Sequence, residues 1–135
     1  VPLAGTVLSG AMDVIAWVGA DALIIDYKTG AGALDEGEAR ERYRLQAECY
    51  GLAALHGGAR HAEVVFAELE RERSIGFEYD ASETADLAER IAVPIHAIGR
   101  GEFAPRDAYV RGLCDACPGF GGLCPVRRPK ADASA

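Results

Sequence analysis

The stretch Leu23–Gly30, LIIDYKTG, ends an apolar run in an acid, an aromatic residue and an amine. An apolar run of this length is typical of a buried strand, along which successive side chains point to opposite faces. Asp26 and Lys28 are therefore expected on one face of the strand and Tyr27 on the other. The triplet places a carboxylate beside an ammonium group, which makes either an ordinary ion pair at a strand end or part of a site.

The pattern around this strand predicts a mixed α/β domain with the element order β-β-β-α-β-β-α. Short turns are expected to join the first three strands into an antiparallel meander. The expected strands and helices, in chain order, are strands 3–10, 11–18 and 22–29, helix 38–55, strands 62–69 and 73–80, and a helix from 82 to about 98.

Local signals predict how the two helices begin and which side faces the core. The first helix has a predicted apolar stripe of Leu45, Cys49, Leu52 and Leu55. Ser82 is predicted to cap the second helix, with Asp86 in its first turn. Pro94 is predicted to kink or interrupt that helix.

The composition indicates one folded domain followed by a tail. Half of the 135 residues are hydrophobic, which is enough for one core. Glycine, proline and cysteine dominate late in the chain, so we divide it into a core of residues 1–100 and a cysteine-rich tail of residues 101–135. No apolar run approaches the ~20 residues of a membrane span, and we expect a cytoplasmic protein.

The net charge of −7 argues against a free-standing, non-specific nucleic-acid binder, which is usually basic. It says less about an enzyme that collects carboxylates around a cation, or about a domain whose partner supplies a positive channel. The charge therefore weakens a nucleic-acid function without excluding it.

Asp13 and Asp26 lie at similar distances from the turn at Gly19–Asp21. If the two strands pair as a hairpin, their carboxylates converge at one end of the sheet. Two close carboxylates repel each other unless a proton or a cation lies between them, and Mg²⁺ or Mn²⁺ takes oxygen ligands while keeping several waters. Lys28 beside such a site is able to orient a water and offset charge on a phosphate.

Three motifs, in order along the chain, resemble those of the RecB/AddB-type branch of the PD-(D/E)XK nuclease superfamily. They are a G-x-x-D on one strand, a D-Y-K-T-G on the next and a Q-x-x-x-Y on the following helix, present here as Gly10–Asp13, Asp26–Gly30 and Gln46–Tyr50. The resemblance implies a restriction-endonuclease-like core, in which helices flank a mixed central sheet.

The resemblance also implies roles for individual residues. The implied catalytic residues are Asp13, Asp26, Lys28, Gln46 and Tyr50. Asp13, Asp26 and the backbone carbonyl of Tyr27 would bind Mg²⁺ or Mn²⁺, and Lys28 would be the catalytic amine. Gln46 would lie near the lysine and the phosphate, and Tyr50 near the DNA backbone; from spacing alone, both could simply satisfy hydrogen bonds where the helix meets the sheet.

Two features depart from the family pattern. Val14 stands where the family usually carries arginine after the first aspartate. The family also has an upstream helix that often contributes a His or Glu, and the chain starts too late to contain it. We therefore expect a domain truncated at its N-terminus, part of a larger protein, with weak activity or none on its own.

The tail carries Cys114, Cys117 and Cys124 in a C-x2-C-x6-C pattern. The spacing alone leaves open zinc, an iron–sulfur cluster or plain thiols. Members of the same nuclease branch hold a 4Fe–4S cluster with such a tail and an upstream cysteine, so the resemblance implies three cluster ligands here and a fourth outside the chain. Cys49 is a poor substitute because its helical stripe is expected to face the core.

The resemblance implies a metal-dependent nuclease that hydrolyses DNA phosphodiester bonds, as part of a RecB-family exonuclease or helicase–nuclease in DNA repair and recombination. The implied partners are DNA and a helicase domain or partner subunit. One alternative is a CRISPR-associated exonuclease, which shares the motifs and the tail. Another is a non-catalytic DNA-end-binding module of the same fold, against which the five intact site residues count.

Overall fold

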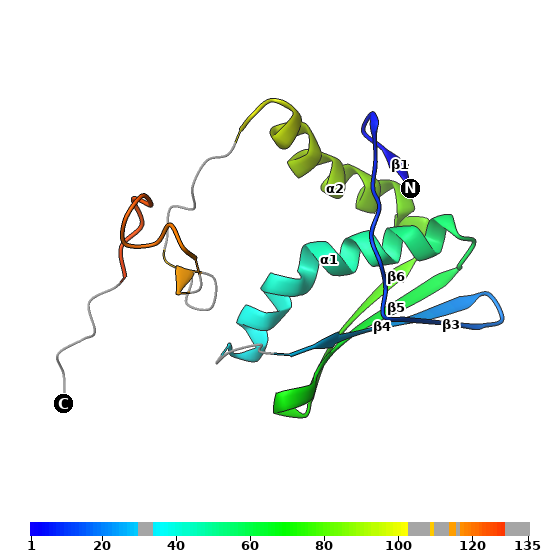
Figure 1. Cartoon of the computed structure of the whole chain (residues 1–135). Helices are drawn as coiled ribbons and strands as arrows, with labels where there is room; N and C mark the ends of the chain where they lie inside the picture. The colour runs from blue at the N-terminus through cyan, green and yellow to red at the C-terminus, as the bar shows by residue number, and fades with distance from the viewer. Residues whose placement is uncertain (30–33, 103–108, 110–113, 116, 129–135) are drawn as a thin grey trace.

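The computed structural model describes residues 1–29, 34–102, 109, 114–115 and 117–128 of the chain (Figure 1). Strands and helices alternate as expected for a mixed α/β domain, and the predicted fold class is confirmed. The described elements are β1 (Pro2–Leu3), β2 (Thr6–Val7), β3 (Val14–Val18), β4 (Asp21–Lys28), α1 (Glu36–His56), β5 (His61–Glu68), β6 (Arg73–Asp80) and α2 (Thr84–Gly99).

The main sheet has four strands in the order β3-β4-β5-β6. Strands β3 and β4 are antiparallel, β5 and β6 are antiparallel, and β4 and β5 are parallel. Helix α1 connects the parallel pair and lies across one face of the sheet, and α2 packs against α1 (Figure 1). Among the described elements, none covers the opposite face. The sheet is therefore mixed, as the sequence predicts, with both helices on one side.

The predicted first strand over residues 3–10 is wrong. Ala4 (φ 51°) and Gly5 (φ 76°) both adopt the left-handed conformation, which a two-residue hairpin turn of type I′ requires. The chain reverses there, and β1 pairs with β2 in a small separate sheet. The second predicted strand also begins later than expected, so that Asp13 precedes β3 instead of lying on it.

Helix α1 begins two residues before the predicted start because of a capping box. The Asp35 side chain accepts a hydrogen bond from the Glu38 N–H at 2.9 Å, and the Glu38 side chain accepts one from the Asp35 N–H at 3.0 Å. These bonds satisfy backbone donors that have no partner within the helix.

The predicted apolar stripe of α1 is only partly right. Leu52 and Leu55 are buried and Cys49 is half-buried, but Leu45 is 48% exposed. The face that meets the sheet consists mainly of small residues with one aromatic ring: Ala39, Tyr43, Ala47, Gly51 and Ala54. Small side chains let the helix approach the sheet closely, and Leu45 lies outside that face.

Helix α2 is capped differently from the prediction. Ser82 does not cap it: a short 3₁₀ turn over Ala81–Glu83, begun by a capping box of Asp80 and Glu83, leads into the helix, and the N-cap residue of α2 is Glu83, without a side-chain cap. The helix continues past Pro94 to Gly99 without interruption. A proline removes one backbone donor, and here the turns on both sides remain helical.

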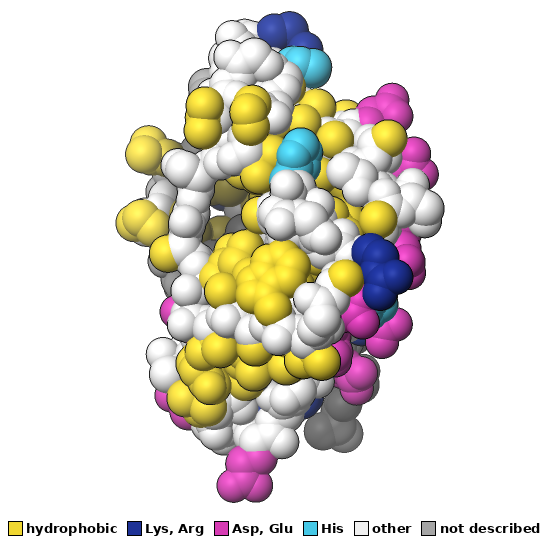
Figure 2. Space-filling model, turned by 90° about the vertical axis from the view of Figure 1, so that its right-hand side faces the viewer, with side chains coloured by type: hydrophobic (Ala, Val, Ile, Leu, Met, Phe, Trp, Pro, Cys, Tyr) yellow, Lys and Arg dark blue, Asp and Glu magenta, His cyan; other side chains and the backbone are white. Residues whose placement is uncertain are grey.

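Strand β3 is an edge strand with large apolar side chains in solvent. The exposed fractions are 37% for Val14, 44% for Ile15, 46% for Trp17 and 76% for Val18. Figure 2 shows hydrophobic side chains gathered in several patches on the side where the β3–β4 turn lies. β-branched and aromatic residues suit a strand even without burial. In the described part of the chain, no helix is long and apolar enough to cross a membrane.

Gly51 marks a close approach of α1 to the sheet. A Cβ at this position would lie 2.9 Å from the Cε2 and Cγ atoms of Tyr79 on β6, and nearer still to Cδ2. Real Cβ contacts are longer, so any larger residue must push the helix away from the buried ring.

We predict that Gly51→Ala lowers the free energy of unfolding by about 1–3 kcal/mol, because added volume in a packed core forces a shift of the helix or the ring. Denaturation by urea measures the change. Gly99→Ala is the control, since no atom lies within 4 Å of a Cβ there, and it should leave stability unchanged or slightly raised. Equal stabilities of the two variants would contradict the close approach.

Candidate active site

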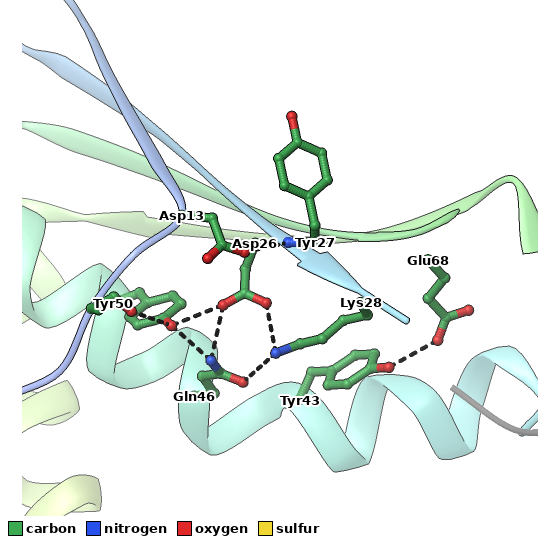
Figure 3. Close-up of polar contacts among 9 residues, drawn as sticks. Asp13, Asp26, Tyr27, Lys28, Tyr43, Gln46, Tyr50 and Glu68 are labelled. Atoms are coloured by element: carbon green, nitrogen blue, oxygen red, sulfur yellow. Dashed lines mark hydrogen bonds and ion pairs between the residues drawn. The ribbon is translucent and has the colours of Figure 1, made fainter. Parts of the chain in front are cut away.

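The site lies where β3 begins and β4 ends. The register pairs Val14 with Ile25, so the preceding residue, Asp13, comes opposite Asp26. The carboxylate of Asp13 accepts a hydrogen bond from the Tyr27 N–H at 2.8 Å. Figure 3 shows the Asp13 and Asp26 side chains next to each other at this end of the sheet. The two predicted acids are therefore brought together.

Asp26 is a buried carboxylate, only 6% exposed, and each of its oxygens has partners. Its Oδ1 lies 2.6 Å from the Lys28 Nζ. Its Oδ2 accepts from the Gln46 Nε2 at 3.1 Å and lies 2.9 Å from the Tyr50 hydroxyl. A buried anion is costly unless it is paired and hydrogen-bonded, and these contacts compensate the charge.

Gln46, on α1, joins the acid to the amine. Its Oε1 accepts from the Lys28 Nζ at 3.0 Å, while its Nε2 donates to Asp26 and to the Tyr50 hydroxyl, the latter at 2.7 Å. Because one end of the amide accepts and the other donates, its partners determine its orientation. The i,i+4 spacing of Gln46 and Tyr50 puts both on the helix face above β4.

The Tyr50 hydroxyl also links α1 to the segment before β3. It lies 2.8 Å from the Ala11 carbonyl oxygen as well as within reach of Asp26. A hydroxyl has one proton, so it donates to one of these acceptors at a time. Burial, followed by the hydrogen bond to Asp26, raises the pKa of Tyr50, which keeps the phenol protonated and able to donate.

Lys28 is placed by polar groups on one side and aromatic rings on another. Its Nζ lies 5.1 Å from the ring centroid of Phe66 and 5.6 Å from that of Tyr43. The ammonium group of a lysine carries three N–H donors, and Asp26 and Gln46 each accept from it. The Tyr27 side chain points away from this cluster (Figure 3) and is 49% exposed, so only its backbone faces the site.

A groove of about 820 Å³ adjoins the site between the N-terminal segment and α1. Gln46 and Tyr50 line the groove as well as the cluster around Asp26. Other residues of its lining are Leu8, Gly10, Met12, Arg42 and Leu45. The exposure of Leu45, which contradicts the predicted stripe, is thus an exposure to this groove.

Three residues near Lys28 were missed by the sequence analysis. Tyr43 donates to the Oε1 of Glu68 at 3.0 Å, and the Arg73 Nε donates to its Oε2 at 2.7 Å. Glu68 is an acid that directly follows an apolar run of β5, as Asp26 follows one of β4, and Tyr43 precedes Gln46 by one helical turn. Those two signals were present in the sequence.

Cys114, Cys117 and Cys124 of the tail lie in the described stretches 114–115 and 117–128. Cys114 is buried, Cys117 is exposed and Cys124 is half-buried, and the Cys117 N–H donates to the Cys114 carbonyl at 3.2 Å. All four cysteines belong to the described residues, and none forms a disulfide. Within the same residues, no three His, Cys, Asp or Glu side chains gather in a group that could hold a metal ion.

No curated protein and no solved structure matches the chain. A family model does match it: that of the PD-(D/E)XK nuclease superfamily, over residues 2–125. The matched range contains the whole sheet, both helices and every residue of the cluster around Asp26. The chain belongs to the PD-(D/E)XK nuclease superfamily.

Proposed function

We propose that this domain hydrolyses DNA phosphodiester bonds with the help of a bound Mg²⁺ or Mn²⁺ ion. The observation that carries the proposal is the meeting of two carboxylates, Asp13 and Asp26, with the ammonium group of Lys28 at one end of the sheet. Membership of a nuclease superfamily supports the same chemistry.

The donor groups at this end of the sheet fit a hard divalent cation. Asp13 and Asp26 offer carboxylate oxygens, and the Tyr27 carbonyl is proposed as a further oxygen ligand. Two or three protein ligands suffice for Mg²⁺, which usually keeps several waters. When bound, such an ion supplies Lewis-acid stabilisation of the phosphoryl oxygens and a water of lowered pKa.

The side chains of the site would stabilise the charge on the phosphate and position the reacting groups. Lys28, held by Asp26 and Gln46, presents a positive charge where negative charge develops on the phosphate. Gln46 would keep the ammonium directed at the site, and Tyr50 would lie near the DNA backbone. The nucleophile would be water, with no covalent intermediate.

The groove beside the site is the proposed path of the DNA strand next to the scissile bond. Gln46 and Tyr50 line the groove and also contact Asp26, so a DNA strand that lies in the groove would reach the side chains around Asp26 directly. The net charge of −7 is unfavourable for many simultaneous phosphate contacts. We therefore propose that a helicase domain or partner subunit supplies most of the basic surface, as in a RecB-family exonuclease or helicase–nuclease of DNA repair and recombination.

For the tail, we propose that Cys114, Cys117 and Cys124 are ligands of a 4Fe–4S cluster, with a fourth ligand from another part of the protein. The support is the C-x2-C-x6-C spacing and the turn that brings the first two cysteines together. The same tail favours a CRISPR-associated exonuclease as the second candidate for the whole protein. In either protein the iron–sulfur cluster would be structural, because its cysteine ligands are not among the side chains that surround Asp26.

We predict that Mn²⁺ binds at Asp13 and Asp26 and that Asp26→Ala abolishes the binding. The reason is that the change removes one of two carboxylate ligands, and titration calorimetry measures the binding. Asp86→Ala, a matched change at an exposed acid of α2, should bind Mn²⁺ like the parent. Equal binding by the parent and the Asp26 variant would show that the metal site is wrongly placed.

We predict that Lys28→Ala in the full-length natural protein lowers the rate of DNA cleavage at least ~10²-fold, the usual order for loss of one group that stabilises the transition state. Affinity for DNA should change little, because Lys28 is half-buried and paired with Asp26, so its loss removes little of the positive charge that meets the DNA. Lys130→Ala, at the other lysine of these 135 residues, is the control and should cleave normally. Unchanged turnover in the Lys28 variant would leave this lysine as an ion-pair partner alone.

We predict that the full-length natural protein is brown when purified without oxygen, with broad absorption at about 400 nm, as iron–sulfur clusters show. Replacing Cys117 with serine should remove both the colour and the bound iron. A colourless protein that contains stoichiometric zinc by elemental analysis would overturn the iron–sulfur proposal and leave the nuclease proposal intact.

A further inference from the structure

A second buried acid, Glu68, lies beside Lys28 on the neighbouring strand. The parallel register of β4 and β5 pairs Lys28 directly with Glu68, and paired residues point to the same face of a sheet. The Glu68 side chain is completely buried. Lys28 therefore has two acids on the same face of the sheet beside it, Asp26 and Glu68. Of these two, its ammonium group forms an ion pair with Asp26.

Arg73 explains why Lys28 pairs with Asp26 and not with Glu68. It is the register partner of Glu68 on β6, and its guanidinium contacts the Glu68 Oε2 through Nε at 2.7 Å and Nη2 at 2.5 Å. The other carboxylate oxygen accepts from the Tyr43 hydroxyl at 3.0 Å. Arginine remains charged and its planar fork matches a carboxylate, so the charge of Glu68 is compensated without the lysine.

Tyr43 connects this ion pair to Lys28. Its ring stacks on Phe66, with centroids 4.7 Å apart and an angle of 21° between the planes, and the Lys28 ammonium lies over both rings. Figure 3 shows the Tyr43 ring between the end of Lys28 and the Glu68 carboxylate. The face of an aromatic ring attracts a cation, and this ring also occupies the space between the lysine and the second acid.

We propose that Arg73, Glu68 and Tyr43 form a positioning network that keeps the Lys28 ammonium on Asp26 and Gln46. The arginine neutralises the competing acid, the acid anchors the tyrosine hydroxyl, and the tyrosine ring supports the ammonium group. The consequence for catalysis rests on the proposed nuclease function; the placement of Lys28 itself does not. None of the three residues needs to touch DNA.

The chain contains only two lysines, Lys28 and Lys130, which allows a direct test by NMR. Lysine labelled with ¹³C at Cε gives one signal for each, and Lys130→Arg identifies the second. Because the ammonium of Lys28 lies over two rings, its Hε protons are expected upfield of those of free lysine. This measurement reports where Lys28 lies, whether or not the protein cleaves DNA.

The decisive variant is Arg73→Met, which leaves Glu68 without its cation. Lys28 should then turn toward Glu68 and its Hε signal should move. In the full-length protein kcat should fall about tenfold or more, since small displacements of a catalytic group are costly, while KM changes little. The double variant Arg73→Met with Glu68→Gln removes the competing charge and should restore both the signal and kcat.

Arg90→Met is the matched control. Arg90 donates from Nε to the Oε1 of Glu48 at 3.0 Å, and Glu48 is 7% exposed, so the control also deprives a buried acid of its arginine, but between α1 and α2. It should lose stability without moving the Lys28 signal or changing kcat. Thermal unfolding, followed by circular dichroism, ensures that the variants are compared below their transitions.

A second pair of variants keeps the test valid if Arg73→Met does not fold. Tyr43→Phe retains the ring and should hold the Lys28 signal upfield, whereas Tyr43→Leu should shift it toward free lysine. A Lys28 signal that is the same in the parent, Arg73→Met and Tyr43→Leu would overturn the positioning network. A protein that shows all the expected shifts but never cleaves DNA would support the network and refute the nuclease function.

Discussion

Strands β4 and β5 run in the same direction, and parallel neighbours can be joined only by a connection that crosses a face of the sheet. Here the connection is α1, which therefore lies over the strand that carries Asp26 and Lys28. The crossover brings Gln46 and Tyr50 within hydrogen-bond distance of the Asp26 carboxylate. Every contact of the candidate site between helix and sheet depends on this parallel pairing.

Buried acids recur around α1, and each has a basic partner. Asp26 pairs with Lys28, Glu68 with Arg73 and Glu48 with Arg90. A buried ion pair adds little net stability once desolvation is counted, but loss of one partner is costly. Such pairs therefore contribute definite geometry. At the end of the sheet, the pairs Asp26–Lys28 and Glu68–Arg73 lie side by side. Because Arg73 pairs with Glu68, Lys28 stays on Asp26, where the proposed chemistry needs it.

Local patterns predicted most elements but not their surroundings. Strand β6 has the predicted bounds, and β5 differs by one residue at each end. The first strand failed because Ala4 and Gly5 reverse the chain within an apolar stretch that reads as continuous. The stripe of α1 failed at Leu45 because the helix meets the sheet through small residues, whose hydrophobic signal is weak. Which face of a helix packs against the sheet depends on the surface of the sheet, and the residue pattern of the helix alone does not specify that surface.

The sequence by itself determined two local arrangements: Asp26 and Lys28 on one face of a strand, and Gln46 and Tyr50 on one face of a helix. Both follow from backbone periods that any strand or helix has. Only the tertiary structure decided that these two faces meet, that Glu68 lies next to Lys28 on the neighbouring strand, and that Arg73 lies next to Glu68 on the strand beyond. The reason is that strand register and helix packing join residues far apart in the chain, and no local period specifies them.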